Sequence, residues 1–263
     1  MTPSEVTETL ARHLEEDPRV EGVFLGGSLA TARADECSDV DLGVVAGNTE
    51  EECRNVYDLW PSLAQALGEP LVCLERSWEN CRMVALLYGR ADCPPRGLEV
   101  DVIFSRLEHV AEQMPHSPYR VLFDRTGRLA DTLARTQTPL GTGEVVDDLR
   151  RQMLWFPFYV YDANKGLVRG DSLHVQSLLQ QMREAIFFAC ACRQAAPVYG
   201  AKGATAVLSA EERSTVEASY RVEPSQALTM LRGLYFGCLR EIPESWGITP
   251  DLDRLKAALD ALP

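Results

Sequence analysis

The stretch GGSLATARADECSDVDLGVV, residues 26–45, sets a glycine pair and a serine ahead of a strand that contains two aspartates. Successive side chains of a strand point to opposite faces, so Asp39 and Asp41 share one face. The alternate residues are apolar and are expected to enter the core: Val40, Leu42 and Val44. Two neighbouring carboxylates repel each other unless a divalent cation lies between them, and Mg²⁺ prefers oxygen ligands. The stretch therefore predicts a strand with one buried face and one metal-binding face.

A second strand, LEVDVIF at residues 98–104, repeats this pattern, with Glu99 and Asp101 on the face opposite the apolar residues. If the two strands are neighbours, Asp101 supplies a third carboxylate to the same ion. Three carboxylates on adjacent strands can hold one or two Mg²⁺ and help to activate a hydroxyl group. Glu99 shares the face of Asp101, so the sequence leaves open which of the two is the general base, or whether Glu99 is only a solvated strand end.

The glycines and the serine offer a phosphate site about a dozen residues before the aspartates. Gly26 and Gly27 allow close approach of the backbone, and backbone N–H groups with the Ser28 hydroxyl can bind phosphate at a helix N-terminus. The loop lacks the G-K-[ST] ending of a P-loop, which disfavours that chemistry. A phosphate site followed by paired carboxylates suits the transfer of part of a nucleoside triphosphate.

Hydrophobic periodicity divides the chain into two halves near residue 142. The expected strands of the first half are at 20–27, 38–45, 70–75, 82–88, 98–104 and 119–124, and its expected helices at 4–16, 49–67 and 106–114, with a helical turn or two at 28–34. The expected helices of the second half are at 143–164, 175–189 with Asp171 as N-cap, 209–219, 224–240 and 251–261. The predicted class is α+β, with a mixed-sheet domain at 1–138 and a helical bundle domain at 139–263.

Composition limits the function classes. The 263 residues carry 26 Lys plus Arg against 39 Asp plus Glu, a net charge of −13, which disfavours a nucleic-acid partner and suits a cationic small substrate. No apolar stretch reaches the length of a membrane span, and the acidic N-terminus does not resemble a signal peptide, so a cytoplasmic location is expected. The eight cysteines show no CxxC spacing and are expected to be free thiols, with a metal role disfavoured for Cys190 and Cys192.

Residues 26–45 resemble the nucleotidyltransferase signature of the DNA polymerase β-like superfamily, a glycine–glycine–serine followed by aspartates at alternate positions of a strand. Asp101 in VDVIF matches the separate third carboxylate of that family. An N-terminal transferase domain followed by helices is similar to the branch that acts on small molecules, which includes aminoglycoside and lincosamide nucleotidyltransferases. The strand order extends the resemblance over roughly 130 residues, and the helical half matches only in general character.

The resemblance implies transfer of a nucleoside monophosphate, usually AMP from ATP, to an acceptor hydroxyl, with release of pyrophosphate. Asp39 and Asp41 would bind Mg²⁺, Asp101 would be the third ligand, the general base or both, and Gly27 and Ser28 would hold the β- and γ-phosphates. The chain departs from many members at Ala32, where they have glycine. The neighbouring Arg33 is either a phosphate contact or a solvated side chain.

The second half offers further candidates. Lys165 and Arg169, in NKGLVRGD, are expected to reach the triphosphate or to lie in a solvated loop, and Lys202 is a weaker candidate. The aromatic run at 155–161 is expected to form helix core and domain interface, or to stack on a base or sugar. The favoured function is a Mg²⁺-dependent transferase that modifies a small hydroxyl compound such as an aminoglycoside antibiotic. The alternatives are a protein-modifying enzyme of antitoxin type and a non-catalytic nucleotide-binding regulator.

Overall fold

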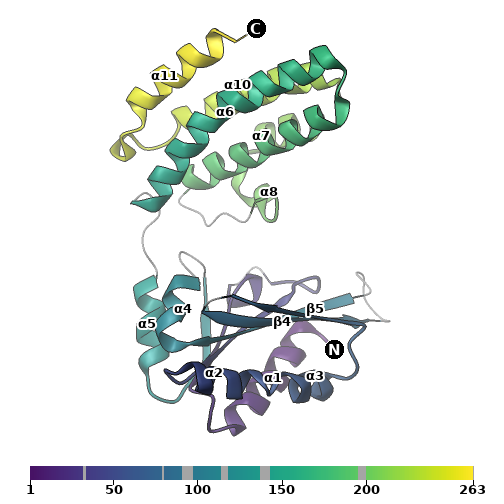
Figure 1. Cartoon of the computed structure of the whole chain (residues 1–263), viewed down its shortest axis with the longest axis vertical. Coiled ribbons are helices and arrows are strands. Elements are labelled where there is room, and N and C mark those ends of the chain that lie inside the picture. Colours follow the sequence, from purple (N-terminus) through teal and green to yellow (C-terminus); the bar gives the residue numbers. More distant parts are fainter. Residues whose placement is uncertain are drawn as a thin grey trace. The chain divides into compact units, whose positions relative to one another are not determined.

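The computed structural model of the chain describes residues 1–31, 34–78, 80–90, 97–113, 118–136, 143–194 and 200–262. The chain divides into two compact units, Met1–Thr138 and Pro139–Pro263 (Figure 1). The first unit combines a mixed sheet with helices, and the described part of the second is helical. The predicted α+β class is therefore confirmed.

The first unit is built on a six-stranded sheet of order β3-β4-β5-β2-β1-β6. The strands are β1 Gly22–Leu25, β2 Val40–Ala46, β3 Val72–Ser77, β4 Cys81–Gly89, β5 Gly97–Arg106 and β6 Arg120–Asp124. Only β2 and β5 run parallel, and the other neighbouring pairs are antiparallel. All six strands lie where the hydrophobic pattern predicts them, because alternation of apolar residues is the local signature of a strand with one buried face.

Helices cover the two faces of this sheet unequally. The helices of the first unit are α1 Pro3–Glu16, η1 Ser28–Ala30, α2 Glu50–Tyr57, α3 Trp60–Leu67, α4 Leu107–Gln113 and α5 Arg128–Thr136. One face packs against α1, α2 and α3 and forms the larger core of the unit. On the other face, α4 and α5 pack around Phe24 and Val45. The candidate site lies on this second face of the sheet, on β2 and β5.

Two predictions for the first unit need correction. The single helix expected over 49–67 is two helices, because α2 ends at Tyr57 and α3 begins at Trp60. Pro61 lies in the first turn of α3, where a proline is tolerated because the backbone N–H groups of that turn have no partner within the helix. Helix α5 was not predicted, and Leu129 and Leu133 anchor it on the sheet.

The second unit packs α6, α7 and α10 around one apolar core. Its helices are α6 Glu144–Arg169, α7 Ser172–Arg193, α8 Ala204–Val207, α9 Ala210–Ala218, α10 Pro224–Arg240, η2 Glu244–Trp246 and α11 Thr249–Asp260. Asp171 is the N-cap of α7 and accepts a hydrogen bond from the His174 backbone N–H at 3.2 Å, as predicted. Helix α6 continues five residues beyond its predicted end at 164, so Lys165 and Arg169 lie on a helix rather than in a loop.

The aromatic run of α6 divides between core and surface. Phe156 is fully buried and stacks on Tyr235 of α10, with ring centroids 3.8 Å apart. Trp155, Phe158 and Tyr161 are exposed, each by half or more of its surface. The expected core role is therefore confirmed for Phe156, and Tyr159 packs against the same core while partly buried. No helix in the described ranges is long and apolar enough to cross a membrane.

Candidate active site

The register of the two parallel strands places two of the predicted carboxylates next to each other. Asp41 of β2 pairs with Asp101 of β5, and paired residues on adjacent strands point to the same face. Both residues are half-buried. Asp39 and Glu99 each come one residue before this ladder begins, and Glu99 is exposed. Four acidic residues therefore gather at the amino ends of β2 and β5.

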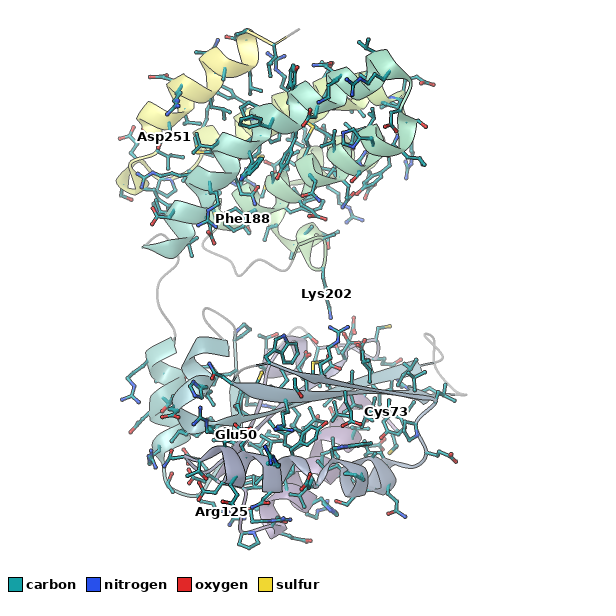
Figure 2. All side chains as sticks on the ribbon, in the orientation of Figure 1. Glu50, Cys73, Arg125, Phe188, Lys202 and Asp251 are labelled. Atoms are coloured by element: carbon teal, nitrogen blue, oxygen red, sulfur yellow. The ribbon has the colours of Figure 1, made fainter. Side chains whose placement is uncertain are left out.

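The strand faces agree with the alternation read from the sequence. The predicted apolar positions of β2 and β5 are buried, with at most 3% of any side chain exposed: Val40, Leu42, Val44, Leu98, Val100, Val102 and Phe104. This burial fixes the carboxylates on the other face, because a slip of one residue would exchange the two faces of the strand. Figure 2 shows the side chains of this unit, with Glu50 on α2 and Cys73 on β3 as landmarks.

Small residues flank the carboxylate pair across the sheet. On one side the backbone N–H of Gly26 donates to the Asp41 carbonyl oxygen at 2.9 Å. On the other side Ala85 of β4 pairs with Asp101, and Leu74 of the edge strand pairs with Ala85. Gly26 and Ala85 are thus the small neighbours of the carboxylate pair across the sheet. The sequence does not reveal Ala85 and Leu74 as neighbours of the site, because it does not give strand order or register.

Gly27 lies against the carboxylate of Asp41. A Cβ at this position would come within 2.1 Å of the Asp41 Oδ2 atom, far inside van der Waals contact. The backbone of Gly27 also has φ of 59° and ψ of −150°, a region that only glycine adopts readily. Glycine is therefore required here for two independent reasons, and the main chain closes over the carboxylate. Ser28 follows at once and begins the short 3₁₀ helix η1.

A tight turn precedes Asp39 and sets its position. The Asp35 backbone N–H donates to Ser38 Oγ at 2.9 Å, and Ser38 Oγ donates to Asp35 Oδ1 at 3.1 Å. Arg90, just after β4, donates to the carbonyl oxygen of Glu36 at 2.9 Å and ties the turn to the sheet. Ala32 and Arg33 lie outside the described residues, so the predicted contact of Arg33 with phosphate stays a prediction.

The donor set of the first unit fits a hard divalent cation. The carboxylates of Asp41 and Asp101 lie on one face of the sheet, and the backbone at Gly27 comes so close to Asp41 that there is no room for a Cβ. Carboxylate oxygens are the ligands that Mg²⁺ prefers. The register of β2 and β5 places Asp41 and Asp101 side by side. In the described residues, a compact group of possible ligand atoms, all within 4.8 Å of one another, occurs in the second unit at Cys190, Glu212 and Cys238.

The remaining predicted residues lie in the second unit. Lys165 forms an ion pair with Asp162, and its Nζ atom is 5.4 Å from the centroid of the Tyr161 ring. Arg169 is exposed in the last turn of α6. Lys202 is exposed just before α8. Lys165 is thus already bound to a neighbouring carboxylate, whereas Arg169 presents its side chain to solvent.

No protein-family model and no curated protein matches the chain. The solved structures that are similar to it include two nucleotidyltransferase structures. An aminoglycoside 6-adenyltransferase from Bacillus subtilis has 16% identity and a TM-score of 0.34, with 97% of this chain and 99% of that chain covered. A nucleotidyltransferase-like protein from Exiguobacterium sibiricum 255-15 has 12% identity and a TM-score of 0.39, with 92% and 76% covered.

The chain is thus similar to nucleotidyltransferase structures, the class that the motif at residues 26–45 resembles. TM-scores of this size describe a loose overlap of the two chains.

Proposed function

We propose that this chain is a Mg²⁺-dependent nucleotidyltransferase that transfers a nucleoside monophosphate, AMP in the first instance, from an NTP to a hydroxyl group of a small molecule. One observation carries the proposal: Asp41 and Asp101 lie side by side on the face of the sheet opposite α1, α2 and α3, and Gly27 closes over Asp41. Two carboxylates in adjacent positions on a sheet repel each other. A bound cation gives this costly arrangement a function.

The carboxylates Asp39, Asp41 and Asp101 are the proposed metal ligands. When bound there, Mg²⁺ would neutralise charge on the triphosphate and orient its α-phosphate. The half-buried position of Asp41 and Asp101 on rigid neighbouring strands holds their oxygens in place before substrate binds. Fixed charges that need no reorganisation during the reaction are a main source of rate enhancement.

The reaction itself requires one proton acceptor. The acceptor oxygen bonds to the α-phosphorus, the bond to the bridging oxygen of the β-phosphate breaks, and pyrophosphate leaves. We assign the hydroxyl proton to the carboxylate of Asp101, which is half-buried beside Asp41. Glu99 is the rival base, because it lies on the same face two residues earlier, but it is exposed to solvent.

The backbone at Gly27 and the hydroxyl of Ser28 are the proposed ligands of the β- and γ-phosphates. Both residues are half-buried and follow β1 directly, beside Asp41. Arg33, Lys165 and Arg169 remain proposed triphosphate contacts, to be tested by substitution. Of the two in the second unit, Arg169 has the exposed side chain that such a role requires.

The acceptor is proposed to be a cationic small molecule, with an aminoglycoside as the first compound to test. The net charge of −13 attracts cations and repels nucleic-acid backbones. The acidic residues at the amino ends of β2 and β5 would add a local attraction for an amine group of the acceptor. The helical unit is the proposed acceptor-binding domain, and a cytoplasmic site of action is proposed with it.

A pyrophosphate-release screen tests the proposal, with the four NTPs combined with aminoglycosides, lincosamides and other hydroxyl compounds. We expect Mg²⁺-dependent turnover with at least one acceptor, abolished in Asp41→Asn and unchanged in Asp131→Asn, an exposed aspartate of α5. Labelled ATP in cell lysate separates acceptor classes, because label on protein would indicate a protein-modifying enzyme. ATP binding with no pyrophosphate release for any acceptor would show a regulator and exclude the enzyme.

A further inference from the structure

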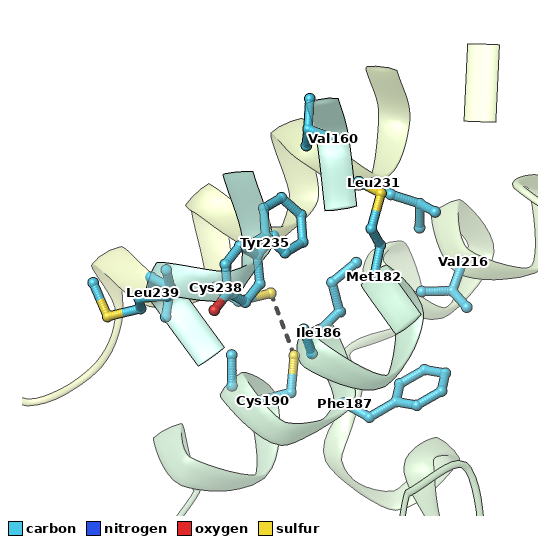
Figure 3. Packing of buried hydrophobic residues seen from close by; sticks show 14 of the residues in the cluster. Val160, Met182, Ile186, Phe187, Cys190, Val216, Leu231, Tyr235, Cys238 and Leu239 are labelled. Carbon is cyan, nitrogen blue, oxygen red and sulfur yellow. Dashed lines mark hydrogen bonds between the residues drawn. The ribbon is translucent and has the colours of Figure 1, made fainter. Parts of the chain in front are cut away.

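Three possible metal ligands from three helices meet in the core of the second unit. Cys190 of α7 and Cys238 of α10 have their sulfur atoms 3.3 Å apart (Figure 3), and Glu212 Oε1 of α9 lies 3.4 Å from the Cys238 sulfur. Both cysteines are buried to 99% or more. The three ligand atoms all lie within 4.8 Å of one another. The sulfur atoms are free thiols, well beyond the roughly 2.05 Å of a disulfide bond.

A buried hydroxyl without a partner lies beside this group. Tyr235 is fully buried, and its Oη atom makes no hydrogen bond within the described part of the chain. It precedes Cys238 by three residues on α10, which places both on one side of the helix, and Figure 3 shows them together. An unsatisfied hydroxyl in an apolar core costs about 1–3 kcal/mol, so its presence next to two thiols indicates a group that is not part of the chain.

We propose that Cys190, Cys238 and Glu212 bind a thiophilic divalent cation, with zinc as the first candidate, and that this ion cross-links α7, α9 and α10. Two sulfur ligands and one carboxylate form a donor set that zinc accepts and magnesium does not. Binding removes the protons of both thiols, so one Zn²⁺ enters and two protons leave to solvent. None of the three residues is among the proposed ligands of Mg²⁺ or of the triphosphate, so the proposal does not rest on the transferase chemistry.

A divalent ion would reduce the negative charge of the group. Two thiolates and one carboxylate carry three negative charges, of which the ion would neutralise two, and the guanidinium of Arg193 pairs with both Glu212 and Glu241. Arg193 donates to both oxygens of Glu212, at 2.7 and 2.9 Å, and so fixes the orientation of that carboxylate. Hydrogen-bonded partners of this kind hold the ligands of most protein metal sites in place.

The geometry requires a small adjustment. Two thiolates at about 2.3 Å from a tetrahedral zinc lie about 3.8 Å apart, so the observed separation of 3.3 Å would open by about 0.5 Å. Since both sulfurs are buried, the ion is expected to enter as the unit folds rather than to exchange at the surface.

Cobalt substitution tests this proposal in the full chain. We expect protein refolded under reducing conditions with Co²⁺ to show thiolate-to-cobalt absorption in the near ultraviolet, at one ion per chain, and zinc to abolish it. Cys238→Ser and Cys190→Ser are expected to weaken binding by at least tenfold. Cys192→Ser is the matched control, because Cys192 is buried on the same helix but lies outside the group.

Three results would overturn the site. The first is the absence of the absorption band in the wild-type protein, and the second is an unchanged band in both ligand variants. The third is a thiol titration in denaturant that finds six of the eight cysteines, which would show a disulfide instead. If a serine variant does not fold by circular dichroism, Glu212→Gln supplies the same comparison, because it keeps the shape of the side chain and removes the charge.

Discussion

The two units place their polar groups in different ways. In the first unit the carboxylates lie on strands, and two of them, Asp41 and Asp101, are paired by the register of β2 and β5 on the less covered face. In the second unit Cys190, Glu212 and Cys238 come from three helices and meet within the core. The difference teaches that a strand can carry a site on one face at little cost to its core. A helical bundle that gathers polar groups inside must satisfy them there.

The largest expected effect is on catalysis in the first unit. Asp41→Asn should lower the rate of pyrophosphate release by about 10³-fold, because it removes a fixed charge at the reacting phosphate. The rate is measured at saturating Mg²⁺ and NTP, with circular dichroism to confirm the fold. Asp131→Asn, exposed on α5, should keep the wild-type rate. Wild-type turnover in Asp41→Asn would contradict the assignment of the site.

The second unit should respond to core substitutions in stability. Phe156→Ala should destabilise this unit by about 3–5 kcal/mol, because it leaves a cavity where the ring stacks on Tyr235. Phe158→Ala, an exposed position on the same helix, should change stability by less than about 0.5 kcal/mol. Hydrogen exchange resolved by mass spectrometry reports on each unit separately. Equal losses from both variants would mean that Phe158 is buried in solution.

A comparison of Gly27 with Gly127 separates the effect of a close contact at Cβ from the effect of backbone strain. Gly27→Ala should lower turnover by about 10²-fold and destabilise the first unit by about 1–3 kcal/mol, because its Cβ would displace the Asp41 carboxylate. Gly127→Ala is the matched control, since Gly127 also has positive φ, at 74°, but nothing lies within 4 Å of its Cβ. Thermal melts and turnover numbers should therefore show a stability loss in both variants and an activity loss only in the first. Similar turnover in the two would remove Gly27 from the site.

The smallest expected effect concerns repulsion between the paired carboxylates. Without divalent cations, Asp101→Asn should stabilise the first unit by about 0.5–1 kcal/mol, because like charges directly opposite on a sheet are destabilising. Added Mg²⁺ should raise the melting temperature of the wild-type chain more than that of the variant. A melting temperature that is lower in the variant than in the wild type, without metal, would show that the carboxylates do not repel each other.

The strands of the first unit could be predicted well because their signal is local. Alternation of Val40, Leu42 and Val44 with Asp39 and Asp41 gives both the strand and its faces, although β2 itself begins at Val40. The break at Asp58 and Leu59 and the helix α5 could not be predicted with the same success. In the first case one apolar stripe continues across two helices, and in the second a short helix packs on the sheet mainly through Leu129 and Leu133, too few residues to show a helical period.

The sequence by itself determined that Asp39, Asp41 and Asp101 are unusual as charged residues within apolar strands. The alternation of side chains along a strand assigns each of them to one face. The sequence also determined the glycines that precede them. Only the tertiary structure decided that β5 is the parallel neighbour of β2, that Gly27 closes over Asp41, and that Ala85 is the neighbour of Asp101. The same holds for Cys190, Glu212 and Cys238, for which the cysteine spacing disfavours a metal site. Residues more than twenty positions apart share no local period, so only the packing of their helices brings them together.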